Sequence, residues 1–303
     1  MPSYITHRYF AETIIPKVSE EIQAQIIHSP LYNVGAQGPD LLFYIRYNKN
    51  KSISTLGEKM HTTNEVQSIF EKSADYAKIH PKIIPFLYGQ LAHYALDKVS
   101  HPYIYSREED LKKYYPKSVH KHIHIAFESA LDYIVLEKFK GKNSNSHKGH
   151  KELKCDNDTE NEIAEFYVNL IAPIFNSDLN IKIAKRIFNK RRLFMYCINS
   201  RSNIKHHFFR LIEIIAGGTN MITNFMRPRK YVEAENWDNH MRIEYPRYRN
   251  SMEIYDNYTF AEQLERAKEI AIDLFKQFNN YMKGKGCLTK ELYDTNYSGD
   301  KIK

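Results

Sequence analysis

Apolar residues recur at helical spacing along most of this chain, and this pattern limits the possible folds more than any other feature of the sequence. Only 11 Gly and 11 Pro occur among 303 residues, fewer than the many turns of a β-sandwich or barrel would need. The sequence therefore predicts an all-α protein built as a helical bundle. The expected helices, separated by polar spacers, cover 17–28, 62–77, 83–100, 118–138, 161–171, 181–197, 204–226 and 260–282.

Local signals mark the ends of some of these helices. Gly217-Gly218 interrupts the segment 204–226, which predicts two helices there. Thr259 is followed by Glu262 at the third position after it, the pattern of a capping box at the start of the last helix.

A polar stretch over 141–160 divides the chain. Because it is rich in Asn, Lys and Ser and poor in apolar residues, it predicts a flexible connection. The core is then 1–140, and 161–283 is a helical region that completes the domain. The polar tail 284–303 is expected to be loose.

Charge and cysteine content indicate the setting of the protein rather than its chemistry. A net charge of +8 favours a substrate that carries phosphate, but the lysines are scattered along the chain, so no stable nucleic-acid partner is expected. The cysteines, Cys155, Cys197 and Cys287, have no metal-binding spacing and fit a reducing compartment. With no secretory signal and no apolar run long enough to span a bilayer, we expect a soluble cytoplasmic protein.

The strongest chemical signal is a ladder of His93, Asp97 and His101. At i, i+4 and i+8 these side chains lie on one face of a helix, about 6 Å apart per step. Neighbours can share a metal ion, but the outer pair is too far apart for one ion with bonds of about 2 Å. The ladder therefore predicts neighbouring metal ions with Asp97 between them. Pro102 disfavours a helical conformation at His101, so the helix is expected to fray there.

A second ladder carries His124 and Glu128 at the same i, i+4 spacing. A histidine and a carboxylate so spaced can hold one zinc ion above their face of the helix. Asp132 continues the ladder and is interpreted as a supporting or structural residue. Two such helices facing each other could enclose a metal cluster.

Upstream of the ladders, His7, Asp40 and His61 lie in short motifs that are individually unremarkable. His7 could be a core histidine, Asp40 a turn residue after a Gly-rich loop, and His61 a residue near a helix start. Their order along the chain is what gives them meaning.

Taken together, these segments resemble the bacterial zinc-dependent phospholipase C family. The motifs that carry the resemblance are, in chain order, THRYF, GAQGPDLLFY, LGEKMH, LAHYALDKVSHPYIY and HIAFESALD. The later segment ENWDNHMRIEYPRYRN, with the helix after it, is similar to the C-terminal part of intracellular members. The resemblance implies the helical-bundle fold that this family shares with the three-zinc single-strand nucleases.

The resemblance also implies which residues bind zinc. The ligand sets would be Asp40, His61, His93 and Asp97; His101, His124 and Glu128; and His7 with Asp97. Asp40 would also be the general base, and Asp97 would bridge two ions. Secreted members complete the third zinc site with a processed N-terminal Trp, whereas this chain starts with Met1, so two to three zinc ions are expected.

The activity implied by the resemblance is hydrolysis of a phosphodiester bond, with a phospholipid headgroup as the substrate and transient contact with a membrane surface. Two alternatives stay open: a single-strand nuclease or nucleotide phosphodiesterase on the same fold, and a zinc-binding helical protein without turnover. The sequence shows no obvious amphipathic membrane anchor, and Trp237 is expected to be buried by packing.

Overall fold

The computed structural model describes residues 4–115, 117, 120–149, 155–198, 203–217, 222–228, 230, 232 and 235–302, and it is mostly helical, as the sequence predicts. The helices are α1 (Tyr4–Ile14), α2 (Glu20–Ile26), α3 (Pro30–Gly35), α4 (Lys51–Ser54), α5 (Leu56–Thr62), α6 (Val66–Ile79), α7 (Ile84–Lys112), α8 (His120–Ile134), α10 (Asn157–Phe166), α11 (Ala172–Ile174), α12 (Ile181–Ile198), α13 (Asn203–Ile215) and α14 (Phe260–Met282). Short 3-10 helices include η1 (Ile15–Lys17), η2 (Gly38–Ile45), η3 (Pro81–Ile83) and η7 (Thr223–Phe225), and π-helical turns extend α8 over Val135–Phe139 and α10 over Tyr167–Ile171.

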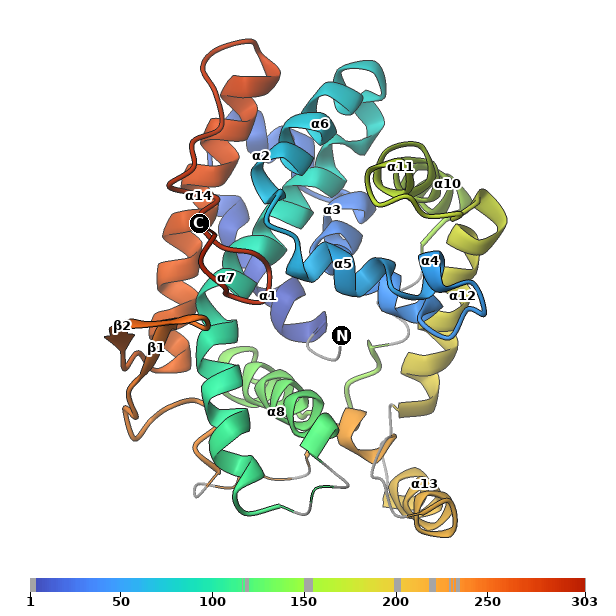
Figure 1. Ribbon diagram of the computed structural model, residues 1–303, viewed down its shortest axis with the longest axis vertical. Helices are drawn as coiled ribbons and strands as arrows, with labels where there is room; N and C mark the ends of the chain where they lie inside the picture. The colour runs from blue at the N-terminus through green and yellow to red at the C-terminus, as the bar shows by residue number, and fades with distance from the viewer. Residues whose placement is uncertain are drawn as a thin grey trace.

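The long helix α7 forms the centre of the bundle (Figure 1), and α1, α3, α8 and α14 pack along it. Its first half is buried on nearly every side, from Phe86 to Asp97, so this half has no solvent-facing stripe. Aromatic contacts join it to α14, where Phe275 and Phe278 pack against Tyr88. The helix that carries the first ladder is therefore held rigidly in the core.

Glycines allow α3 and the loop after it to approach α7 closely. A Cβ on Gly35 would lie 2.1 Å from the carbonyl oxygen of Phe86, and one on Gly89 would lie 2.4 Å from that of Tyr32. Gly38 has a φ of +52°, and its Cβ would lie 2.3 Å from the ring of His93. Because no side chain fits in these gaps, glycine is required there, and η2 with Asp40 comes to lie beside the ladder on α7.

The expected fraying of α7 at His101 is wrong. Although Pro102 lies inside the helix and has no N–H to donate, α7 continues to Lys112. Just beyond the proline, Tyr103 is fully buried and packs against Phe127 of α8 and Tyr245. Packing of this second half outweighs the loss of one backbone hydrogen bond, so His101 keeps its place in the ladder.

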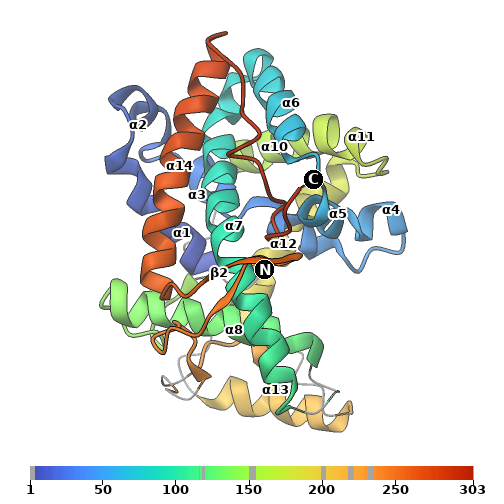
Figure 2. The same cartoon turned by 60° about the vertical axis from the view of Figure 1, so that its left-hand side comes forward.

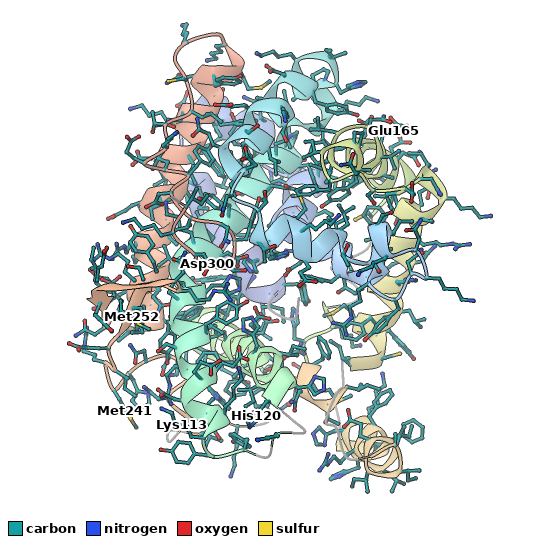
Figure 3. The ribbon with its side chains drawn as sticks, in the orientation of Figure 1. Lys113, His120, Glu165, Met241, Met252 and Asp300 are labelled. Carbon is teal, nitrogen blue, oxygen red and sulfur yellow. The ribbon has the colours of Figure 1, made fainter. Side chains whose placement is uncertain are left out.

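The expectation of a loose tail after residue 283 is also wrong. Within 284–302, the side chains of Leu288, Tyr293 and Tyr297 are buried. Tyr94 of α7 stacks on Tyr293, with ring centroids 5.8 Å apart, and donates a hydrogen bond of 2.8 Å to the carbonyl of Thr295. The tail therefore lies along α7; Asp300, labelled in Figure 3, marks its end near the middle of that helix.

The described residues contain a two-stranded β-sheet, a hairpin that the sequence pattern did not predict. Strands β1 (Tyr245–Tyr248) and β2 (Ser251–Asp256) pair antiparallel and lie beside α7 (Figure 2). Arg249, in the turn between them, makes an ion pair with Asp300 of the tail.

The local helix signals are confirmed. Thr259 and Glu262 form a capping box at the start of α14. Helix α13 ends at Ile215, so the predicted segment 204–226 is indeed interrupted near Gly217, while Gly218 lies outside the described residues. Helix α10 begins at Asn157, inside the stretch predicted as a flexible connection, of which 150–154 are not described. Within the described residues, every helix is too short or too polar to cross a membrane.

Candidate metal centre

The first ladder presents its side chains together on one face of α7. Asp97 lies between its neighbours, with Oδ2 2.9 Å from Nε2 of His93 and 3.8 Å from Nδ1 of His101. All three side chains are buried. The i, i+4 spacing thus produces the shared central carboxylate that the sequence predicts.

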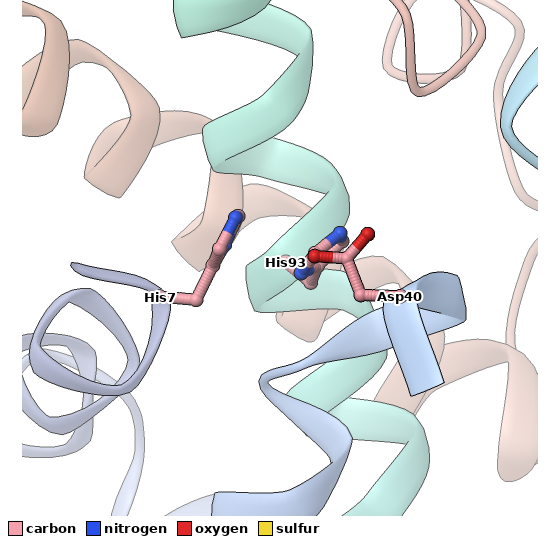
Figure 4. A group of neighbouring side chains, drawn as sticks. All are labelled: His7, Asp40 and His93. Atoms are coloured by element: carbon pink, nitrogen blue, oxygen red, sulfur yellow. The ribbon is translucent and has the colours of Figure 1, made fainter. Parts of the chain in front are cut away.

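The N-terminal helix α1 brings His7 against this ladder. Its Nε2 lies 3.3 Å from Asp97 Oδ1, and its ring stacks on that of His93 with centroids 3.9 Å apart. Figure 4 shows His7, Asp40 and His93 converging from α1, η2 and α7. Residues from widely separated parts of the chain therefore meet at one point.

Asp132 holds α1 in this position rather than entering the cluster. Its Oδ1 accepts hydrogen bonds from the backbone N of Thr6 at 2.9 Å and from Thr6 Oγ1 at 2.8 Å. These bonds fix the first turn of α1 directly before His7. The interpretation of Asp132 as a structural residue agrees with this geometry.

Asp40 approaches the ladder from the side opposite His7 (Figure 4), and His61 lies beside Asp40. Asp40 Oδ1 lies 3.0 Å from His61 Nε2, and η2 and α5, which carry them, pack on each other. His61 Nδ1 in turn lies 2.7 Å from the carbonyl oxygen of Gly57. Both side chains face the same cavity.

The second ladder, on α8, completes a separate group with His101. Glu128 Oε1 lies 3.2 Å from Nε2 of His124 and 3.6 Å from Nε2 of His101. The other ring nitrogen of His124, Nδ1, lies 3.2 Å from Oε2 of Glu108. This carboxylate was not among the residues predicted from the sequence. Helices α7 and α8 thus enclose a site between them.

Backbone carbonyls fix the orientation of the histidine rings. Nδ1 of His93 faces the carbonyl of Ala36 at 3.1 Å, and Nδ1 of His101 faces the carbonyl of Tyr297. Because a carbonyl oxygen only accepts, each Nδ1 is assigned the ring hydrogen, and the lone pair of Nε2 points into the cluster. Tyr297 comes from the tail and could not have been recognised from spacing in the sequence.

Charge and burial act in opposite directions on the central groups. Burial favours the neutral form of Asp97, but the neighbouring His101, His93 and His7 outweigh it and hold the pKa of Asp97 well below its usual range. Burial lowers the pKa of His7, with a contribution from His93 beside it. At neutral pH the centre therefore offers an ionised carboxylate beside an imidazole that favours its neutral form.

The nitrogen and oxygen atoms of the cluster suit the binding of metal ions. Two hydrogen-bond acceptors, His93 Nε2 and Asp97 Oδ2, lie 2.9 Å apart, and such a pair needs a proton or a cation between its members. Among the described residues, His7 Nδ1, His93 Nε2 and Asp97 Oδ2 are buried atoms without a hydrogen-bond partner. Atoms that could bind a metal ion lie within 4.8 Å of one another in three groups: His7, Asp40 and His93; His61, His93 and Asp97; and His101, His124 and Glu128.

All the predicted ligands therefore lie in one cluster, although the grouping differs in part. The last group is the ligand set expected for the second zinc. Asp40 is grouped with His7 and His93 rather than with His61, His93 and Asp97, and His7 also contacts Asp97. Nitrogen from imidazole and oxygen from carboxylate are ligands that zinc accepts. Met1, discussed above for the third zinc, lies outside the described residues.

A cavity of about 340 Å³ opens onto the cluster. The side formed by the cluster carries Asp40, His61, Asp97, His101, His124 and Glu128. The remaining wall includes the cations Arg46 and Arg249 and the aromatic rings of Phe43, Tyr105 and Phe225. These wall residues could not be recognised from the sequence, because arginines and aromatic rings have no spacing that marks the wall of a cavity, even where they lie inside the quoted motifs, as Phe43 and Tyr105 do.

The chain matches a model of a known protein family. A family model described as zinc dependent phospholipase C matches residues 6–179, a span that contains every predicted ligand. Neither the curated proteins nor the solved structures gave a match to this chain.

Proposed function

The chain belongs to the zinc-dependent phospholipase C family, and from this premise we propose that it is a zinc hydrolase that cleaves a phosphodiester bond in a phospholipid headgroup. The observation that carries the proposal is that two hydrogen-bond acceptors face each other in the cluster. Nε2 of His93 lies 2.9 Å from a carboxylate oxygen of Asp97, and Nδ1 of the same ring is already engaged by a backbone carbonyl.

We propose that two or three zinc ions occupy the cluster. The ligands would be His7, Asp40, His61, His93, Asp97, His101, His124 and Glu128. Zinc held there would supply positive charge to the phosphoryl oxygens and lower the pKa of a bound water towards about 7.

The side chains of this chain would divide the remaining work. Asp40, which lines the cavity beside His61, would accept the proton of the attacking water at its carboxylate. Arg46 and Arg249 lie on the cavity wall, where their guanidinium groups would bind and orient the phosphate. Phe43, Tyr105 and Phe225 would exclude water around the bound headgroup.

The proposal is tested by changing the shared carboxylate. Asp97→Ala should lower both the zinc content per chain and the hydrolysis of a phosphocholine ester, because Asp97 contacts His7 and His93 at once. Elemental analysis of protein with its authentic N-terminus measures the zinc. If this variant kept its zinc and its activity, the proposed site would be wrong.

The choice of substrate needs its own comparison. Release of phosphocholine should exceed cleavage of single-stranded DNA by the same preparation. The reverse order would favour the nuclease alternative, and bound zinc without either activity would favour a zinc-binding protein without turnover.

A further inference from the structure

Helix α13 exposes a continuous apolar face. Ile204, Phe208, Leu211 and Ile215 recur at i, i+4, i+7 and i+11 and therefore lie on one side of the helix. Their exposed fractions are 76%, 58%, 58% and 78%, respectively. Isolated exposed apolar side chains are common on protein surfaces, but a stripe of this length marks an interaction site.

The opposite side of α13 attaches the helix to the protein. Glu213 is 3% exposed and accepts hydrogen bonds from the backbone N of Thr223 at 2.9 Å and from Thr223 Oγ1 at 2.6 Å. Phe209, on the same side, packs against the hydrophobic core. The apolar stripe is thus presented outward by a helix whose other face is held.

A basic residue borders the stripe. At about 100° per residue, Lys205 lies about 90° from the middle of the line from Ile204 to Ile215. Glu213, the sole acidic residue of α13, is turned inward. The adjoining helix α12 contains no acidic residue, and its exposed Tyr196 lies under the ammonium group of Lys205, 4.3 Å from it.

We propose that this face of α13 docks the protein on the surface of a phospholipid bilayer. An apolar stripe bordered by Lys205, on a helix whose acidic residue Glu213 is turned inward, matches the acyl boundary and the phosphate layer of such a surface. The inference rests on the proposed function, since a phospholipid substrate gives the docking its purpose.

The position of α13 connects the docking face to the cavity. In both views the helix lies at one end of the molecule, outside α8 (Figures 1 and 2). Through Glu213 it is bonded to Thr223 in η7, and Phe225 of the same short helix lines the cavity. Docking through α13 would therefore bring the lipid surface to the element that forms part of the cavity wall.

Vesicle co-sedimentation of the full chain tests the proposal. The probes are vesicles of phosphatidylcholine alone and of phosphatidylcholine mixed with phosphatidylglycerol. The variant Phe208→Ser/Ile215→Ser should bind both at least tenfold more weakly, because each removed side chain contributes roughly tenfold or more to partitioning. Ile79→Ser is the matched control, since Ile79 on α6 is 77% exposed, like Ile215 at 78%.

The anionic vesicles should bind the unchanged chain more tightly, and added salt should remove this difference because it screens Lys205. No binding of the unchanged chain, or equal losses in the α13 variant and the control, would overturn the proposal. So would self-association that the α13 variant abolishes without any vesicle binding. Vesicle binding is measured without turnover, so its result stays separate from the test of hydrolysis on the phosphocholine ester.

Discussion

Gly299 offers a sharp test of the link between the C-terminal tail and the metal centre. It lies two residues after Tyr297, whose carbonyl orients His101. Its φ is +76°, and a Cβ there would lie 2.7 Å from Cδ of Pro102. Pro102 is buried within α7 and its ring cannot rotate away, so Gly299→Ala must displace the tail.

The expected loss of stability in Gly299→Ala has two causes. The left-handed backbone costs a residue with a Cβ about 1–2 kcal/mol, and the overlap with Pro102 adds about 1–3 kcal/mol. We therefore expect Gly299→Ala to lower the free energy of unfolding by about 2–5 kcal/mol. Gly286→Ala is the control, because Gly286 has a φ of +89° but no atom within 4 Å of its Cβ position.

Urea unfolding and zinc competition with a chelator measure the two consequences. If the tail moves, His101 loses the carbonyl that orients it, and zinc affinity at the group of His101, His124 and Glu128 should fall roughly 10–100-fold. Gly286→Ala should leave zinc binding unchanged. Equal stability and equal zinc affinity in the two variants would refute the role given to the tail.

Other predictions follow from single contacts. Burial raises the pKa of Asp132 to about 7, so the stability that its neutral carboxyl contributes is full below about pH 4 and is lost as the pH rises towards 7. Urea unfolding at several pH values should show this fall in the free energy of unfolding, and Asp132→Asn should abolish the share of the fall that Asp132 causes. Burial opposes the charged form of His124, but Glu128 and Glu108 outweigh it and raise its pKa to about 9, so zinc must displace a proton and zinc affinity should rise by up to about tenfold per unit between pH 6 and 8; a pH-independent affinity in chelator competition would contradict this. Thr259→Ala should cost about 1 kcal/mol in unfolding because it removes the cap of α14, whereas Thr259→Ser should cost less.

Much of the candidate site could be predicted because its chemistry is local. His93, Asp97 and His101 needed only the geometry of a helix to share a face, and so did His124 and Glu128. Resemblance to a known family then added His7, Asp40 and His61, and the structure places all of these side chains in one cluster. Their assignment as zinc ligands stays a prediction until zinc is measured.

Residues that support or complete the site were not predictable in the same way. Glu108 contacts His124 through the packing of α7 on α8. Arg46 lines the cavity from the end of η2. Arg249 lines it from the turn of a hairpin that the sequence pattern did not reveal. Helical periodicity predicted a helix at the place of α13, but only the fold shows which side of that helix is covered.

The sequence by itself determined the helical class, the capping of α14 and the faces of the ligand ladders, because each depends on residues within a few positions of one another. Only the tertiary structure decided that α7 continues through Pro102 and that the polar tail is packed. The contact between His101 and Tyr297 joins residues 196 positions apart. Such contacts depend on how whole helices pack, so they leave no periodic pattern in the chain, and they were found only when α7 and the tail lay side by side.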